Sequence, residues 1–266
     1  FVEKFLINSP RTEDAGRDAR VLDVLGDAAA QIAPQFATEP LIRAALHSTL
    51  AGAYLWLGDL AGAESESRAA IVDLGGPGVA AASDVGQQTL LTLSEALWRA
   101  ERAAEAIEPA QTVLRERIRA LGERDPATLD ARTMYAHALK HAGRLDEAQS
   151  EYAGVQAAFA GAEPPNEEGS LEMQYHLALV QMDRARALDR NTQAQAIDTL
   201  NSDAADKLEQ VYDARARIWS TDDPRTAEAA AVLAQTLSRL GRFDRCDALF
   251  ESAIATMSRR FGADFW

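Results

Sequence analysis

The sequence predicts an all-α fold, in which stacked helical hairpins form a solenoid behind one N-terminal capping helix. Alanine supplies 54 of the 266 residues and aromatic residues only 6%, a composition that disfavours β-sandwiches and barrels. One sequence pattern of small, apolar, glycine and alanine positions recurs along the chain. Its period is close to 42 residues, and self-similarity of this length is typical of repeat architectures.

Charge and cysteine content exclude several other classes. The chain has 27 Lys and Arg against 41 Asp and Glu, a formal net charge of −14, whereas nucleic-acid binding needs clustered positive charge. The single cysteine excludes a disulfide framework and a cysteine-based zinc module. No apolar run approaches the roughly 18 residues that suggest a membrane span.

Residues 1–39 do not repeat, and we expect them to form a lead-in and a capping helix. Val21, Leu25, Ala28 and Ile32 lie at helical spacing before Pro34, so we expect an amphipathic helix that ends near this proline. Such a helix would cover the apolar face of the first repeat.

Each copy of the repeat has a small residue, an apolar residue three positions later, a glycine four after that, and an alanine five further on. The four copies are Ala51, Tyr54, Gly58, Ala63; Ser94, Leu97, Glu101, Ala106; Ala136, Leu139, Gly143, Ala148; and Ala234, Leu237, Gly241, Cys246. A weaker unit centres on Ala204, which is 42 residues before Cys246. Glutamate replaces glycine in the second copy, and cysteine replaces alanine in the last.

This pattern predicts two helices that pack closely at their small residues. Gly143 and Gly241 can adopt the left-handed conformation that ends a helix. The residues that follow them give the next helix an acidic first turn. Asp125-Pro126 and Asp223-Pro224 then separate successive units, because proline fits the first turn of a helix.

The pattern resembles the tetratricopeptide repeat, in the variant of about 42 residues found in kinesin light chains. We expect the array to cover residues 40–266 with about five hairpins, to be irregular at 156–202, and to be truncated at its C-terminus. The resemblance implies a right-handed superhelix whose concave side is lined by the first helix of each hairpin. It also implies a protein–protein interaction module that binds a peptide or protein partner in this concave groove.

Residues of the first helices that packing does not use are the candidate groove residues. They are Trp56, Gln88, Glu95, Trp98, Arg99, Thr133, His137, Lys140, His141, Gln235 and Arg239. Leu55 and Leu91, and Tyr175 and Met182 of the fourth unit, are further candidates. Trp56 and Trp98 are interpreted as recurring at the same place in neighbouring repeats, either as binding anchors or as packing between repeats.

Three other features have alternative interpretations. His137 and His141 have a spacing that zinc can use, but no further ligands are evident, and a solvent-facing or groove-facing pair is favoured. Cys246 is expected to be a small buried thiol. The segment 189–202 is expected to be an insertion between the two helices of the fourth unit, either tolerated at the hairpin tip or protruding to bind something.

The lead-in, from Phe1-Val2-Glu3-Lys4-Phe5 to Glu39-Pro40-Leu41-Ile42-Arg43, is similar to that of bacterial serine/threonine protein kinases with a tetratricopeptide tail. The resemblance implies a non-catalytic signal-transduction tail, behind a kinase domain that would precede Phe1. The alternative is a scaffold or effector domain of a transcriptional regulator. A small-molecule or hydrolytic domain would need a polar cluster that the sequence does not show.

No catalytic residue, cofactor or metal is assigned, and the fragment itself is not expected to be an enzyme. We expect a protein or peptide partner, no nucleic acid and no direct membrane insertion. A homodimer through the C-terminal end at Phe265-Trp266 is a further expectation. The repeats would be periplasmic if a membrane helix precedes residue 1, and cytoplasmic otherwise.

Overall fold

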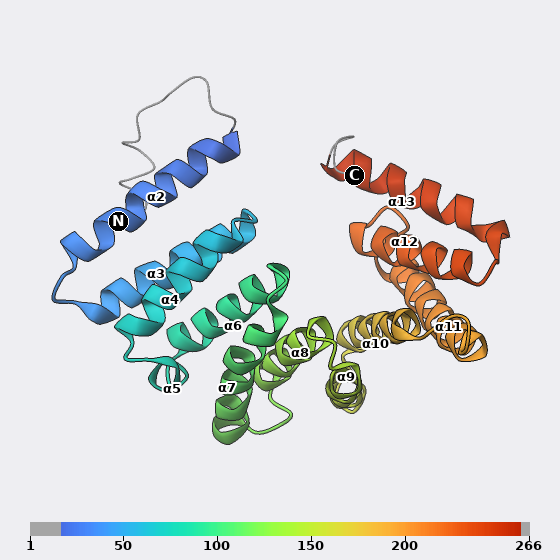
Figure 1. Cartoon of the computed structure of the whole chain (residues 1–266), viewed down its shortest axis with the longest axis horizontal. Coiled ribbons are helices and arrows are strands. Elements are labelled where there is room, and N and C mark those ends of the chain that lie inside the picture. Colours follow the sequence, from blue (N-terminus) through green and yellow to red (C-terminus); the bar gives the residue numbers. More distant parts are fainter. Residues whose placement is uncertain (1–16, 262–266) are drawn as a thin grey trace. The chain divides into compact units, whose positions relative to one another are not determined.

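The computed structural model describes residues 17–261, and the side chains of residues 21–260. Within this part the chain is all-α, with no strand (Figure 1). The α-helices are α2 (Arg17–Gln35), α3 (Pro40–Trp56), α4 (Leu60–Asp73), α5 (Pro77–Ala80), α6 (Asp84–Arg99), α7 (Ala103–Leu121), α8 (Pro126–His141), α9 (Leu145–Ala160), α10 (Glu167–Ala187), α11 (Ala194–Trp219), α12 (Pro224–Arg239) and α13 (Cys246–Phe261). A 3₁₀ turn, η1 (Phe243–Arg245), precedes α13.

The chain consists of two compact units, Phe1–Arg144 and Leu145–Trp266. In the first unit α3 packs on α4, α6 on α7, and the first helices α3, α6 and α8 lie next to one another. In the second unit α10 packs on α9 and α11, and α12 packs on α11 and α13. Each unit is therefore built from antiparallel helical neighbours joined by short links, as the repeat pattern predicts (Figure 1).

The N-terminal helix α2 packs on α3. Leu25, Ala28 and Ile32 are buried and share one apolar cluster with Leu50 and Tyr54 of α3. The helix ends at Gln35, one residue after Pro34, so it ends near this proline as expected. The part of the lead-in before Arg17, like the end at Phe265-Trp266, falls outside the described residues.

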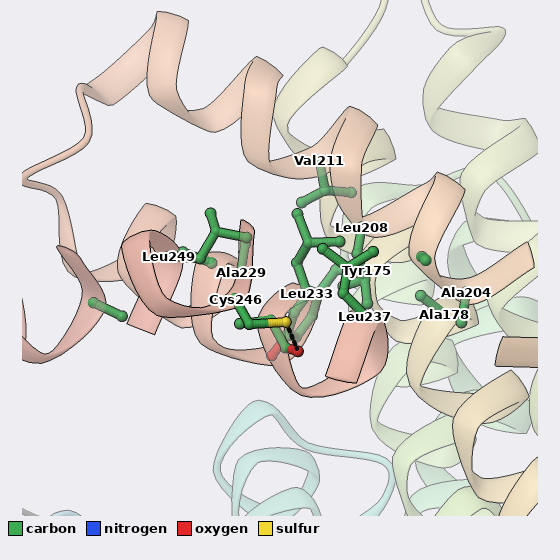
Figure 2. Close-up of a cluster of buried hydrophobic side chains, with 14 of the residues drawn as sticks. Tyr175, Ala178, Ala204, Leu208, Val211, Ala229, Leu233, Leu237, Cys246 and Leu249 are labelled. Carbon is green, nitrogen blue, oxygen red and sulfur yellow. Dashed lines mark hydrogen bonds between the residues drawn. The ribbon is translucent and has the colours of Figure 1, made fainter. Parts of the chain in front are cut away.

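The small positions are buried where helices pack closely. Ala51, Ala63, Ser94, Ala106, Ala136, Ala148, Ala204 and Ala234 are all 0% exposed. Ser94 Oγ donates to the carbonyl oxygen of Ala106 at 2.8 Å, which is possible only because the two helices nearly touch. Cys246 Sγ makes the corresponding contact from the second helix, 3.4 Å from the carbonyl oxygen of Ala234 (Figure 2). Burial raises the pKa of the Cys246 thiol, as expected of a small buried thiol.

The glycine positions end their helices in the same way. In all four copies the backbone N–H one residue after this position donates to the carbonyl oxygen of the apolar repeat residue at 2.9 Å; the pairs are Asp59 to Tyr54, Arg102 to Leu97, Arg144 to Leu139 and Arg242 to Leu237. This is the Schellman arrangement, which needs a positive φ. Glu101 adopts it with φ 62° in place of glycine.

Exchanging the residues at two of these helix ends should change stability in opposite directions. An L-residue in the left-handed region costs about 1–2 kcal/mol, and glycine loses about 0.5–1 kcal/mol more entropy on folding. We therefore expect Glu101→Gly to raise the free energy of unfolding by about 0.5–1 kcal/mol, and Gly143→Glu to lower it by a similar amount. Urea denaturation of both variants checks this, and equal stability of Glu101→Gly and the wild type would contradict it.

The two Asp-Pro links also behave as expected. Asp125 Oδ1 accepts the backbone N–H of Ala127 at 2.9 Å, and Asp223 Oδ1 accepts that of Arg225 at 2.9 Å. Pro126 and Pro224 occupy the first turns of α8 and α12. Each link thus supplies an N-cap and a proline that needs no hydrogen bond.

The fourth hairpin, α10 and α11, differs from the others. Its helices contain 21 and 26 residues, against 14 to 19 in the first three hairpins. The expected insertion at 189–202 is mostly helical, because α11 already begins at Ala194 and only residues 188–193 form the link. Most of the insertion is therefore not a loop, and the extra residues lengthen the start of a helix.

Candidate functional site

A groove in the first unit runs over the first helices of three successive hairpins. It has a volume of about 490 Å³. Its walls come from α3, α6 and α8, and its lining residues are Gly52, Leu55, Trp56, Gln88, Leu91, Thr92, Glu95, Arg99 and Met134. Four of the eleven predicted groove residues lie here, namely Trp56, Gln88, Glu95 and Arg99.

The apolar part of the groove is dominated by one tryptophan. Trp56 is at the last residue of α3 and its side chain is 86% exposed. Leu55, Leu91 and Met134 provide the apolar surface beside it. A large aromatic side chain left in water next to a groove is unusual, because tryptophan normally buries most of its surface.

The polar part of the groove lies along α6. Arg99 Nη1 is 3.4 Å from Glu95 Oε1, one helical turn earlier, and 3.4 Å from the carbonyl oxygen of Leu55 at the end of α3. Gln88 and Thr92 lie on the same helix and also line the groove. These groups can donate to and accept from the backbone of a bound chain.

A second group of predicted residues meets beside this groove. The Trp98 ring of α6 stacks on His141 of α8, with centroids 4.4 Å apart and planes at 16°. His137 lies 6.1 Å from the same ring. Trp98 is half-buried, and its Nε1 is buried without a hydrogen-bond partner among the described residues. The two histidines thus pack against an indole, and no group of three or more metal-ligating side chains occurs in the described part of the chain.

The two tryptophans do not occupy the same repeat position. Trp56 follows Ala51 by five residues, while Trp98 follows Ser94 by four. One residue rotates a side chain by about 100° around a helix, so Trp56 points into water and Trp98 packs on α8. The interpretation that they recur at one place was wrong, and packing between repeats applies to Trp98 alone.

The remaining predictions have mixed outcomes. Thr133 is half-buried and its hydroxyl donates to Leu129 O at 3.0 Å, while Lys140 lies beside His141 in the last turn of α8. Gln235 and Arg239 lie on α12 of the second unit, where Gln235 is exposed and Arg239 half-buried. Tyr175 (Figure 2) and Met182 are only 4% and 2% exposed, so they belong to the apolar core and not to a groove.

Three lining residues were missed: Gly52, Thr92 and Met134. Thr92 and Met134 both lie two positions before the small residue of their copy, Ser94 and Ala136. This shared position could have identified both residues as groove residues from the sequence. Gly52 gave none, since it lines the groove only with backbone.

A polar network is buried in the second unit. The Arg215 side chain is 1% exposed and pairs with Glu172 of α10, which also contacts His176 Nε2 at 3.2 Å. The hydrogen bond from His176 is the largest cause of a lowered Glu172 pKa, which burial opposes and Arg215 supports. The pKa of Tyr175, whose ring lies 4.8 Å from the Arg215 guanidinium, is raised far above its usual value by burial.

The Glu172 network should contribute to the pH dependence of stability. A carboxyl group whose pKa is lower in the folded chain stabilises it above the unfolded pKa, near 4.5, and this stabilisation is lost as pH falls through the folded pKa. We expect Glu172→Gln to be less stable than wild type at pH 7, with a difference that shrinks below about pH 4.5. Urea denaturation of both proteins between pH 3 and 7 measures it, and a difference that does not change with pH would contradict the assignment.

Comparison with known proteins supports the repeat assignment. Residues 226–266 match the family model of the tetratricopeptide repeat. No curated protein matches the chain. Among the described helices, none is long and apolar enough to cross a membrane.

Solved structures share this fold over most of the chain. A putative kinesin light chain from Podosopora anserina with nearly identical TPR-like repeats has a TM-score of 0.59 and 18% identity, and the match covers 80% of this chain and 94% of that one. BtubC (BKLC) from P. vanneervenii gives 0.57 and 14% identity, with 93% and 94% covered. The apo form of RapI gives 0.56 and 10% identity, with 97% and 96% covered. The fold of this chain is therefore that of tetratricopeptide-repeat proteins, with repeats like those of kinesin light chains.

Proposed function

We propose that this chain is a protein-interaction module that binds a peptide segment of a partner protein in the groove of α3, α6 and α8. The observation that supports this most directly is Trp56, 86% exposed beside Leu55, Leu91 and Met134. Tryptophan is enriched among the residues that contribute most of the binding energy at protein interfaces. A helical repeat fold presents such a surface with little conformational change on binding.

The groove suits an extended peptide. Apolar surface at one side can bury one large side chain of the ligand, while Gln88, Thr92 and Glu95 along α6 can pair with backbone amides. Trp98, His137, Lys140 and His141 would extend this surface along the end of α8. Gln235 and Arg239 stay proposed contacts of the second unit.

To test this, a peptide that binds the wild-type chain is selected from a displayed library. Its affinity for the wild type and for variants is then measured. We expect Trp56→Ala to weaken the selected peptide about 30-fold, equivalent to about 2 kcal/mol. The matched control is Phe243→Ala, because Phe243 is also an exposed aromatic, 63% exposed, but lies in the second unit. Equal affinities for wild type and Trp56→Ala would remove the groove as the binding site.

We further propose that the module is the non-catalytic tail of a bacterial serine/threonine protein kinase that acts in signal transduction. The similarity of the lead-in segment supports this. The coding sequence upstream of Phe1 tests it: a kinase domain is expected, and a DNA-binding domain there would favour the transcriptional-regulator alternative instead.

A further inference from the structure

The groove of the first unit contains a glycine, Gly52, in the interior of α3. Gly52 is exposed and lines the groove together with Trp56. In the described part of the chain, a Cβ atom at this position would meet no other helix and no side chain one turn away within 4 Å. Glycine destabilises a helix interior, because it loses more conformational freedom on folding than alanine does. The chain bears this cost at Gly52 although no packing contact requires it.

Glycines in other helices have a packing reason. A Cβ atom on Gly62 would lie 2.7 Å from the ring of Tyr54, and one on Gly169 would lie 2.7 Å from the ring of Phe159. Both distances are shorter than carbon atoms tolerate, so a larger residue would push the elements apart. Close packing therefore accounts for these glycines, and it does not account for Gly52.

The other copies of the repeat have a side chain at the position of Gly52. Gly52 and Trp56 follow the small residue Ala51 by one and five positions, so they lie one turn apart on the same face of α3. The corresponding pairs of the other copies are Glu95 with Arg99, His137 with His141, and Gln235 with Arg239. In the second copy the two side chains meet, with Glu95 Oε1 3.4 Å from Arg99 Nη1. In the first copy the earlier partner of such a pair is missing.

The missing side chain explains why Trp56 is so exposed. A helical side chain leans over the turn that precedes it, and the residue one turn before Trp56 is Gly52. The indole therefore has no side chain to pack on at that position and is 86% exposed. Leu91 of α6 and Met134 of α8 line the same groove. The result is an apolar space whose floor is bare helix backbone.

We propose that Gly52 is a specificity-determining residue, which leaves space for an aromatic side chain of the bound peptide. This inference rests on the proposed peptide groove and names the side chain that the groove takes. An aromatic ring is flat, so it can lie on the bare backbone at Gly52 and stack on the indole of Trp56. The thioether of Met134 also makes favourable contacts with aromatic rings. An aliphatic side chain would bury apolar surface here but could not stack.

The first test fills this space with a side chain of the protein itself. We expect Gly52→Leu to weaken the selected peptide about ten-fold or more, because leucine occupies the place of the ligand ring beside Trp56. The same variant should raise the melting temperature by about 2 °C, because leucine favours a helix more than glycine does. A loss of binding together with a gain in stability cannot come from a damaged fold.

The matched control is Gly26→Leu on α2. Gly26 is exposed, does not line the groove, and its Cβ atom would come no closer than 3.9 Å to another group, the Tyr54 hydroxyl. This variant should give a similar gain in stability and leave the peptide affinity unchanged. Equal peptide affinities of Gly52→Leu and Gly26→Leu would overturn the proposal.

The second test changes the peptide. Each aromatic residue of the selected peptide is replaced in turn by leucine and by alanine. At one position we expect the wild type to lose about five-fold with leucine, where stacking is lost, and about 30-fold with alanine. Both losses should shrink in Gly52→Leu, because the two changes affect the same contact. A selected peptide without an aromatic residue, or equal affinities for the aromatic and leucine forms, would overturn the proposal.

The outcomes separate this inference from the proposed groove itself. If Trp56→Ala weakens the peptide and Gly52→Leu does not, the groove binds the peptide and the role of Gly52 is wrong. If neither variant weakens it, the groove is not the binding site and both proposals fail.

Discussion

Replacing Arg215 with alanine is expected to lower the free energy of unfolding by about 3 kcal/mol. Arg215 is the largest fully buried side chain of the described part of the protein. Its loss removes one partner of a buried ion pair and leaves a cavity, and both changes are costly. The estimate is at the low end for such pairs because Glu172, the partner, is 44% exposed and can regain water.

The guanidinium of Arg215 joins three helices. From α11 it donates through Nη1 to the carbonyl oxygen of Arg225 in the first turn of α12, at 2.9 Å. Through Nη2 it donates to Glu172 of α10. Alanine at this position would therefore leave the start of α12 and the side of α10 without their common donor.

An arginine with the corresponding contacts occurs in the first unit. Arg117 of α7 donates to the carbonyl oxygen of Ala127 in the first turn of α8, and through Nε to Gln87 of α6 at 2.8 Å. Arg117 and Arg215 are separated by the same number of residues as Asp125 and Asp223. The same arginine therefore recurs in the second and fourth hairpins, although the sequence pattern did not identify it.

Urea denaturation of Arg215→Ala measures the effect, with Arg217→Ala as the control. Arg217 lies on the same helix but is exposed, so its removal should change stability by less than about 0.5 kcal/mol. Arg215→Met, which fills much of the volume without a charge, should recover part of the loss. Equal stabilities of Arg215→Ala and Arg217→Ala would show that the buried network contributes nothing.

The small and glycine positions made most of the fold predictable from sequence. Ala51, Ser94, Ala136 and Ala234 all lie where two helices touch, because only a small residue is tolerated there. Glu101 still has the backbone conformation of the glycine position, with φ 62°. The helix end is therefore retained although glutamate in this conformation costs energy. A repeat pattern that close packing imposes can be recognised even where one of its positions holds a different residue.

Side-chain direction was much less predictable. Trp56 and Trp98 differ by one repeat position, and that difference separates an exposed ring from a packed one. The pocket lined by Arg190 and Asn201 was not foreseen, because both residues belong to the extended start of α11 and its link, where the repeat pattern fails. Periodicity describes the positions that packing constrains, and the proposed binding residues occupy the others.

Replacing Ala204 with leucine is expected to lower the free energy of unfolding by about 3 kcal/mol. Ala204 is 0% exposed in α11 and shares an apolar cluster with Ala178 of α10 and Leu233 of α12 (Figure 2). Three added carbon atoms have no free volume there, so the helices must separate or side chains must leave their preferred rotamers. Because overpacking a dense core typically costs about 1–3 kcal/mol, and this contact involves three helices, the upper end is expected.

The matched control for this prediction is Ala196→Leu in the same helix. Ala196 is exposed, and alanine and leucine have similar helix propensities, so this variant should stay within about 0.5 kcal/mol of wild type. Urea denaturation of the two leucine variants separates packing from propensity. If both variants are equally stable, the small-residue positions do not set the distance between helices. The packing explanation of the repeat pattern would then be wrong.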